Sequence, residues 1–220
     1  MTLPIAREAE PVEKPRARRD AAGTRARILA VATREFASRG FEGATTDNVA
    51  AKARVNKRMI YHYFGSKEQL YLEVLEQAYA SARGAEARLK LDEADPAAAL
   101  ARLTEFTFDS FARDRTFISL LNTENRQKAK VLKKSARVED MNSTIVASVD
   151  RILRKGVSSG VFRLDIDAFQ LWVSVVGISY FYFSNIHTLS VIGGRKLDEP
   201  AVRAQRRRHV VDFVLSAVRA

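Results

Sequence analysis

The amino-acid sequence predicts an all-α protein in two parts: a three-helix helix-turn-helix unit near the N-terminus and a larger helical bundle after it. Apolar residues recur at helical spacing along most of the 220 residues, and no segment alternates as a strand does. Residues that cap helices stand before each apolar pattern. We therefore expect a flexible arm over residues 1–22, a helix-turn-helix domain over 23–70 and the bundle over 71–220.

The composition narrows the class of protein. The chain carries 37 Lys and Arg against 26 Asp and Glu, a net charge of +11, which indicates a polyanionic partner such as nucleic acid. It has no cysteine, which excludes disulfides and thiolate metal sites. The N-terminus lacks the apolar core of a signal peptide, and the apolar run at 171–183 is shorter than the ~20 residues of a membrane span. We expect a cytoplasmic protein with no membrane partner.

The first 22 residues hold three of the five prolines and mix acidic with basic side chains. This composition is typical of a mobile arm. Two interpretations remain open: a solvated tail, or a basic arm that reaches DNA phosphates near Arg16 to Arg19.

Four helices are expected between Thr24 and Ala82, each with a capping residue whose side chain can accept from a free N–H group. The caps are Thr24, Thr45 or Thr46, Asn56, and Ser66. Gly40 closes the first helix, the third runs through His62 and the fourth ends near Ala82. Two short helices joined by a tight turn and followed by a supporting helix have helix-turn-helix spacing.

The remainder of the sequence predicts further helices. Their expected starts are Asp95–Pro96, Asp114, Lys128, Asp165 or Asp167, and Glu199–Pro200. The pattern that begins at Lys128 runs to Lys155. The last two helices are more apolar than one small bundle needs, so we expect them to pair with a second copy as a homodimer.

Several motifs lie between Thr24 and Tyr79: "RGF" after the first helix, "TT" at the next cap, "VAAKA" in the second helix, "IYHYF" in the third and "SKEQL" opening the fourth. This segment, about a quarter of the chain, resembles the N-terminal DNA-binding domain of TetR-family transcriptional repressors. The resemblance implies a dimeric repressor that binds an inverted-repeat operator in double-stranded DNA and is released by a small-molecule effector.

The segments "NRQKAK", "GVFRLDID" and "FYFSNIHTLSVI" are similar to the ligand domain of the pyrimidine-utilisation regulator and related catabolic regulators of that family. This similarity implies a planar pyrimidine or an aromatic acid as the effector. Family members usually carry glycine where this chain has Arg54, and often glycine and threonine at Arg58 and Met59. We therefore expect a turn of slightly different shape.

The third helix divides into two faces. Val55, Ile60 and Phe64 form the inward set. The outward set, expected to meet base edges in the major groove, is Lys57, Arg58, Met59 and His62.

A second group corresponds, in the resemblance, to positions that hold the phosphate backbone and set register. Its members are Thr46, Tyr61, Tyr63 and Lys67. For Tyr61 a purely structural role in the core is an equal alternative, because a tyrosine can pack its ring and extend its hydroxyl.

The effector site is expected inside the bundle, lined by apolar side chains with a few polar groups. The candidates by spacing are Phe117, Leu121, Asn125, Trp172, Val176 and Tyr180. Asn125 and Trp172 are the informative members, because a buried amide or indole needs a hydrogen-bond partner that a ligand could supply.

An enzymatic function has little support. The three histidines, His62, His187 and His209, lack metal-ligand spacing, and no glycine-rich loop is present to hold phosphates. We expect no catalytic residues, no metal and no cofactor. The alternatives are a ligand-independent architectural DNA-binding protein, or a module that uses its basic surface for acidic substrates.

Overall fold

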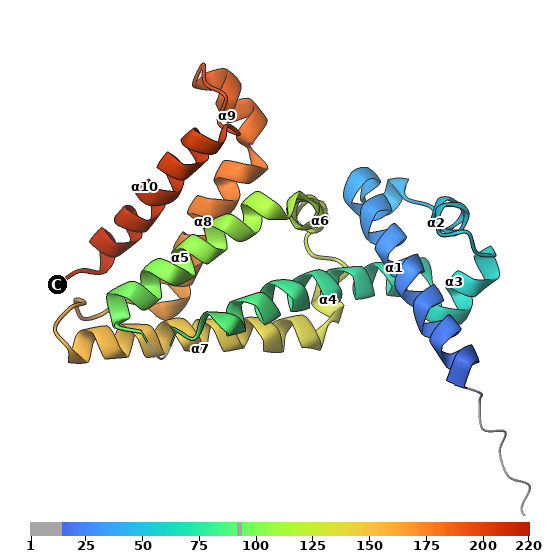
Figure 1. The fold of residues 1–220 in the computed structure, drawn as a ribbon, viewed down its shortest axis with the longest axis horizontal. Coiled ribbons are helices and arrows are strands. Elements are labelled where there is room, and N and C mark those ends of the chain that lie inside the picture. Colours follow the sequence, from blue (N-terminus) through green and yellow to red (C-terminus); the bar gives the residue numbers. More distant parts are fainter. Residues whose placement is uncertain (1–14, 92–93) are drawn as a thin grey trace, which may run out of the picture.

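The computed structural model describes residues 15–91 and 94–220, and helices dominate this part of the chain (Figure 1). The helices are α1 (Pro15–Gly43), α2 (Thr46–Ala53), α3 (Lys57–Phe64), α4 (Lys67–Glu86), α5 (Pro96–Arg113), α6 (Arg115–Arg126), α7 (Ala136–Ser158), α8 (Ala168–Ser184), α9 (Ile186–Ile192) and α10 (Pro200–Val218). The all-α prediction is confirmed. Within the described residues, the β-structure is one isolated antiparallel bridge, between Phe162 and Arg219.

The helix-turn-helix end is built by α1 to α4 around one apolar core. Phe36 of α1, Ile60 of α3 and Tyr71 of α4 are almost completely buried in it. The Tyr71 ring lies 4.7 Å from that of Phe36, centroid to centroid. Large side chains from three helices therefore fix the position of the short α3.

The second part is a bundle in which α5, α7, α8 and α10 pack together (Figure 1). One core cluster lies among α5, α7, α8 and α10, and another joins α5, α6, α8 and α9 around Phe108 and Phe183. The helix α4 extends from the helix-turn-helix end and packs along α7. One continuous helix thus belongs to both parts.

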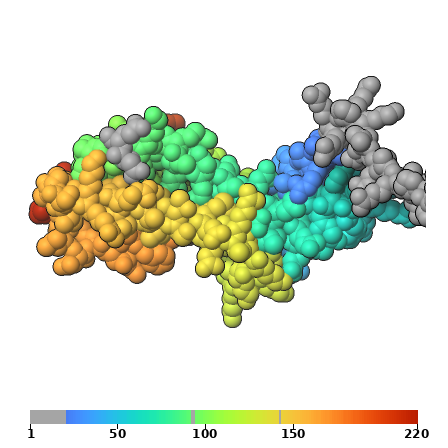
Figure 2. Space-filling model, turned by 90° about the horizontal axis from the view of Figure 1, so that it is seen from below, coloured from blue at the N-terminus to red at the C-terminus, as the bar shows by residue number. Residues whose placement is uncertain are grey.

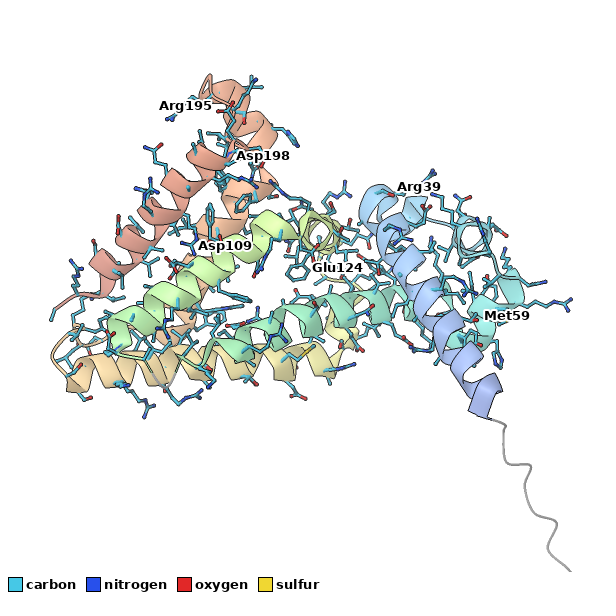
Figure 3. The ribbon with its side chains drawn as sticks, in the orientation of Figure 1. Arg39, Met59, Asp109, Glu124, Arg195 and Asp198 are labelled. Atoms are coloured by element: carbon cyan, nitrogen blue, oxygen red, sulfur yellow. The ribbon has the colours of Figure 1, made fainter. Side chains whose placement is uncertain are left out.

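A second connection runs through α6 and the segment after it. Leu120 and Val131 are buried in the core of the helix-turn-helix end, although they lie far along the chain. The labelled Glu124 in Figure 3 lies in this region, where α6 faces α1. Figure 2 shows the segment near residue 130 against the helix-turn-helix end.

The three largest differences from the predicted helix boundaries lie in α1, α7 and α4. The first helix begins at Pro15 and not at Thr24, so residues 15–22 are helical; the rest of the expected arm lies outside the described residues. The predicted helix from Lys128 begins instead at Ala136, because Lys128 and Ala129 take positive φ of 56° and 53°. The fourth helix continues to Glu86.

No single helix of the described chain is long and apolar enough to cross a membrane. The pair α8 and α9 meets the length and composition criteria only jointly, and it is bent by 73°.

Candidate DNA interface and effector cavity

The short helix α3 is held by caps at both ends. The Asn56 side chain accepts a hydrogen bond from the Arg58 N–H at 2.9 Å. At the other end Gly65 takes φ 73°, which suits a residue without Cβ, and its N–H donates to the Tyr61 carbonyl. Ile60 and Phe64 are buried as expected, and Val55 is half-buried. One face of α3 is therefore fixed against the core.

The opposite face presents Lys57, Arg58 and His62, all exposed. Met59 departs from the expectation: it is half-buried and packs against the core cluster, because its position on α3 adjoins the buried Ile60. The set available to a major groove is thus more basic and less apolar than the sequence suggested.

Lys57 forms an ion pair with Asp47 of α2. Its Nζ donates to Asp47 Oδ2 of α2 at 2.8 Å. The hydrogen bond with Asp47 raises the pKa of Lys57. The ion pair joins the first turns of α2 and α3 and limits the positions that Lys57 samples.

The residues that the resemblance assigns to phosphates lie on three different helices. Thr46 is buried, and its Oγ1 lies 3.4 Å from the hydroxyl of Tyr61, which is 46% exposed. Tyr63 is half-buried and packs on the core. Lys67 places its Nζ 4.7 Å from the centroid of the Phe41 ring, near the end of α1.

Arg54 occupies the turn between α2 and α3 in the left-handed region, with φ 53° and ψ 49°. Its N–H donates to the carbonyl of Ala51. Glycine adopts this conformation without strain, whereas an arginine is strained in it because it carries a Cβ atom. A difference in turn shape from other family members stays a prediction.

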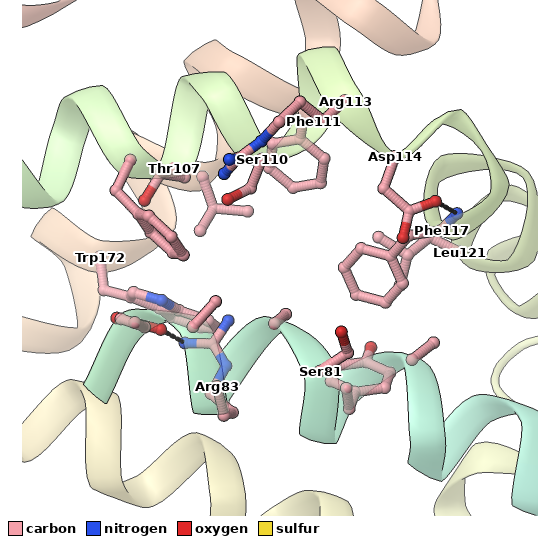
Figure 4. A pocket seen from close by; sticks show the side chains of 17 residues that line it. Ser81, Arg83, Thr107, Ser110, Phe111, Arg113, Asp114, Phe117, Leu121 and Trp172 are labelled. Atoms are coloured by element: carbon pink, nitrogen blue, oxygen red, sulfur yellow. Dashed lines mark hydrogen bonds and ion pairs between the residues drawn. The ribbon is translucent and has the colours of Figure 1, made fainter. Parts of the chain in front are cut away.

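A cavity of about 390 Å³ lies among α4, α5, α6 and α8 (Figure 4). This volume falls within the usual range for small-molecule sites. Apolar and aromatic side chains supply most of its surface, and polar groups enter it from α4 and α5.

Four of the six candidate ligand residues line this cavity: Phe117, Leu121, Trp172 and Val176. Asn125 does not, because it lies exposed in the last turn of α6. Tyr180 also lies outside the lining, and its hydroxyl donates to Asn122 Oδ1. This cavity therefore includes four of the six candidates, and its lining gives no support to a ligand role for Asn125 or Tyr180.

The sequence interpretation missed the charged residues of the cavity. Arg83 and Glu86 both line it, and Arg83 Nη1 lies 2.5 Å from Glu86 Oε2. Burial raises the pKa of Glu86, and Arg83 partly offsets this effect. Both residues lie on the final turn of α4, beyond the expected end of that helix near Ala82.

Metal chemistry finds no support in residues 15–91 and 94–220, which hold no cluster of three or more His, Asp or Glu side chains that could bind a metal ion.

Two family descriptions match the chain. Residues 28–74 match "Bacterial regulatory proteins, tetR family", and residues 96–214 match "Tetracyclin repressor-like, C-terminal domain". The chain belongs to the TetR family. It is a DNA-binding transcriptional regulator, and the resemblance seen in the helix-turn-helix motifs is confirmed.

Relatives and solved structures agree with this assignment. This TetR-family chain is 37% identical to the HTH-type transcriptional repressor NicS of Pseudomonas putida over 196 residues, 89% of this chain and 92% of NicS. The crystal structure of the transcriptional regulator SCO4942 from Streptomyces coelicolor matches with TM-score 0.68 and 26% identity, covering 89% of this chain and 98% of SCO4942. AibR in complex with isovaleryl coenzyme A and operator DNA has TM-score 0.66 over 86% of this chain and 97% of AibR; at 18% identity it shows the shared fold alone.

Proposed function

We propose that this TetR-family protein is a dimeric repressor that acts in the cytoplasm, binds an inverted-repeat operator through α3, and leaves it when a small molecule occupies the cavity. The observation that carries the proposal is the course of α4. Leu70 and Tyr71 of this helix are buried in the core that holds α3, while Tyr79 and Arg83 of the same helix line the cavity. Tyr79 lies eight positions after Tyr71 on this helix, about 12 Å along the axis.

Occupation of the cavity changes repressor activity through this shared helix. A ligand that fits better when α4 is displaced shifts the population toward that position, and α3 moves with α4. In a twofold dimer this displacement alters the separation of the two α3 helices. Affinity for the operator then falls although no DNA-contacting residue has changed.

The proposed roles of the α3 face follow its geometry. Lys57 and Arg58 read base edges, and His62 contacts a base or a phosphate. Met59 contributes mainly by packing. Phosphates are held by Thr46, Tyr61, Tyr63 and Lys67.

The dimer surface lies on α8 and α10. Phe169, Val173 and Phe181 of α8 and Phe213 of α10 are each more than two-fifths exposed. Large apolar side chains on two neighbouring helices indicate a surface covered by another protein chain. Two such helices from each copy would form a four-helix interface.

The effector proposed here is a small molecule with a planar ring. The similarity to the pyrimidine-utilisation regulator suggested a pyrimidine or an aromatic acid, and the aromatic lining of the cavity supports a planar compound. AibR was crystallised with isovaleryl coenzyme A, so a larger ligand is an alternative that a ligand screen should include.

Selection of operators from random double-stranded DNA tests DNA reading. The proposal predicts an inverted repeat, with half-site centres ~34 Å or a multiple of this apart. A ligand-independent architectural protein would return little sequence preference. Replacing both Lys57 and Arg58 by alanine should abolish the preference, whereas a module for acidic substrates would keep its activity.

A thermal-shift screen of catabolic intermediates and acyl-coenzyme A compounds tests the effector part. A ligand at 100 times its Kd should stabilise the folded protein by about 2.7 kcal/mol. Each stabilising compound is then added to the complex with the selected operator. Stabilising compounds that never release DNA would contradict the effector role.

A further inference from the structure

Arg83 is a cation of the cavity wall with unused hydrogen-bonding capacity. Its side chain is 21% exposed, and its Nη1 pairs with Glu86. Its Nε is buried and has no hydrogen-bond partner within the described residues. Figure 4 shows Arg83 on the α4 side of the cavity, which Trp172 also lines. A buried donor without a partner is unusual in a folded protein and indicates that something else binds it.

Glu86 uses only one side of the Arg83 guanidinium. Glu86 takes Nη1, which leaves the edge formed by Nε and Nη2. Two parallel N–H groups on one edge match the two oxygens of a carboxylate. Glu86 can therefore remain in place while a second carboxylate binds Arg83.

The side chains around Arg83 favour a ligand whose carboxylate is attached to a flat, apolar group. The aromatic residues of the cavity are Tyr79, Phe106, Phe111, Phe117 and Trp172. The Tyr79 and Phe117 rings meet edge to face with centroids 5.2 Å apart, and those of Phe111 and Phe117 lie 6.3 Å apart and nearly parallel. Aromatic rings pack well in both arrangements, so an aromatic ligand can join the cluster.

We propose that the effector is a compact aromatic carboxylic acid, bound with its carboxylate on the Nε–Nη2 edge of Arg83 and its ring among the aromatic side chains of the cavity. This proposal rests on the proposed function, since it names the ligand class of the same cavity. A neutral amide satisfies the edge less well, because it offers one acceptor oxygen and a competing NH₂ donor. A phosphate would bring a larger negative charge next to the buried Glu86.

The Glu86 carboxylate lies next to the proposed position of the ligand carboxylate. A second, neighbouring cavity is lined by Arg83 and Glu86 together with Lys90, which follows α4, and Arg151 of α7. Arg83 is the partner that Glu86 has on its own helix. A bound carboxylate on Arg83 repels the carboxylate of Glu86, so Glu86→Gln should tighten acid binding.

The test uses the full-length protein with benzoate and 2-naphthoate, each compared with its neutral amide, in calorimetric titrations. Both acids should bind at least tenfold more tightly than their amides. In Arg83→Met/Glu86→Gln, where no buried charge is left unpaired, acid affinity should fall about 10- to 100-fold while amide affinity stays the same. Arg113→Met is the matched control, since Arg113 lines the opposite wall on α5 and is exposed. Unchanged operator affinity without ligand shows that each variant is folded.

Equal affinity of acids and amides for the wild-type protein, or no binding by either acid, would overturn the proposal. So would a loss of acid binding in Arg113→Met and not in the Arg83 variant. The proposed function fails separately: acids that bind through Arg83 but never release the operator contradict the effector role and leave the ligand assignment standing. If only neutral compounds release the operator, and they do so independently of Arg83, the effector role stands and the ligand assignment is contradicted.

Discussion

The helix α4 packs in a filled core at one end of the molecule and lines a cavity at the other. At the helix-turn-helix end, α4 buries Leu70, Tyr71, Val74 and Leu75 in a filled apolar core. At the bundle end, the same helix lines a cavity of about 390 Å³ and carries a partly buried ion pair. A filled core resists deformation, whereas an unfilled one can change when a ligand enters. In the proposed mechanism, the helix-turn-helix end is the rigid unit, and it moves as a whole when a ligand changes the shape of the bundle end.

If the helix-turn-helix end is a rigid unit, removing one of its core side chains should have the largest effect. Phe64 is 4% exposed, and Phe64→Ala should lower the free energy of unfolding of that end by about 3–5 kcal/mol. The operator affinity should fall with it, because α3 is then no longer held against the core. Chemical denaturation measures the first effect and DNA titration the second.

The control is His62→Ala, an exposed position on the same helix. It should change stability by less than about 0.5 kcal/mol. Equal destabilisation by both variants would show that Phe64 does not hold α3 in place.

Arg58→Ala tests which face of the rigid unit reads sequence. It should cost about 1–3 kcal/mol for each bidentate hydrogen-bonded pair that Arg58 makes with a base, and relax preference at one symmetric pair of operator positions. Titrations on the selected operator and on single-substituted variants measure both. A uniform loss of affinity on every variant would move Arg58 to the phosphate-binding group.

Arg54 offers a way to strengthen the rigid end. At φ 53° an arginine is strained by about 1–2 kcal/mol relative to glycine, so Arg54→Gly should raise the free energy of unfolding. Part of this gain is offset because glycine increases the conformational entropy of the unfolded chain. Arg54→Ala removes the same charge but keeps the strain, and it should leave stability nearly unchanged. A gain in Arg54→Ala equal to that in Arg54→Gly would show that charge, not backbone strain, matters there.

Lys67→Ala should have the smallest effect. It should weaken binding to all sequences nearly alike and reduce the slope of log K against log salt by about 0.9 for each phosphate that Lys67 neutralises. Because Lys67 Nζ also lies over the Phe41 ring, Lys67→Arg serves as the control that keeps the cation there. A change in base preference on Lys67→Ala would contradict the phosphate role.

The helix-turn-helix end can be predicted closely because its signals are local. The side chains of Thr45, Asn56 and Ser66 each accept a hydrogen bond from a backbone N–H at the start of a helix. The sequence alone identifies Asn56 and Ser66 as caps and narrows the other cap to Thr45 or Thr46. The burial of Ile60 and Phe64 follows from helical spacing. Met59 cannot be placed in this way, since its burial depends on how deeply α3 sits in the core.

The cavity can be predicted only in part because it is a tertiary feature. Spacing identifies Phe117 and Trp172, but the direction of Asn125 depends on where α6 ends. Arg83 and Glu86 escape prediction because they lie beyond the expected end of α4 near Ala82. The helix instead continues through Gly84, although glycine in a helix interior costs about 1 kcal/mol, and this continuation brings the ion pair into the cavity.

The central claim is that a ligand in the cavity moves α3 through α4, and a distance measurement between the two subunits tests it most directly. The chain has no cysteine, so Ala51→Cys, exposed on α2, gives one spin-label site per subunit. Pulsed electron paramagnetic resonance then measures the distance between the two labels in three samples: the free dimer, the dimer with operator, and the dimer with an effector from the thermal-shift screen. We expect the operator to narrow the distribution around one separation and the effector to shift it to another as DNA is released. Release of DNA with an unchanged separation would contradict the account.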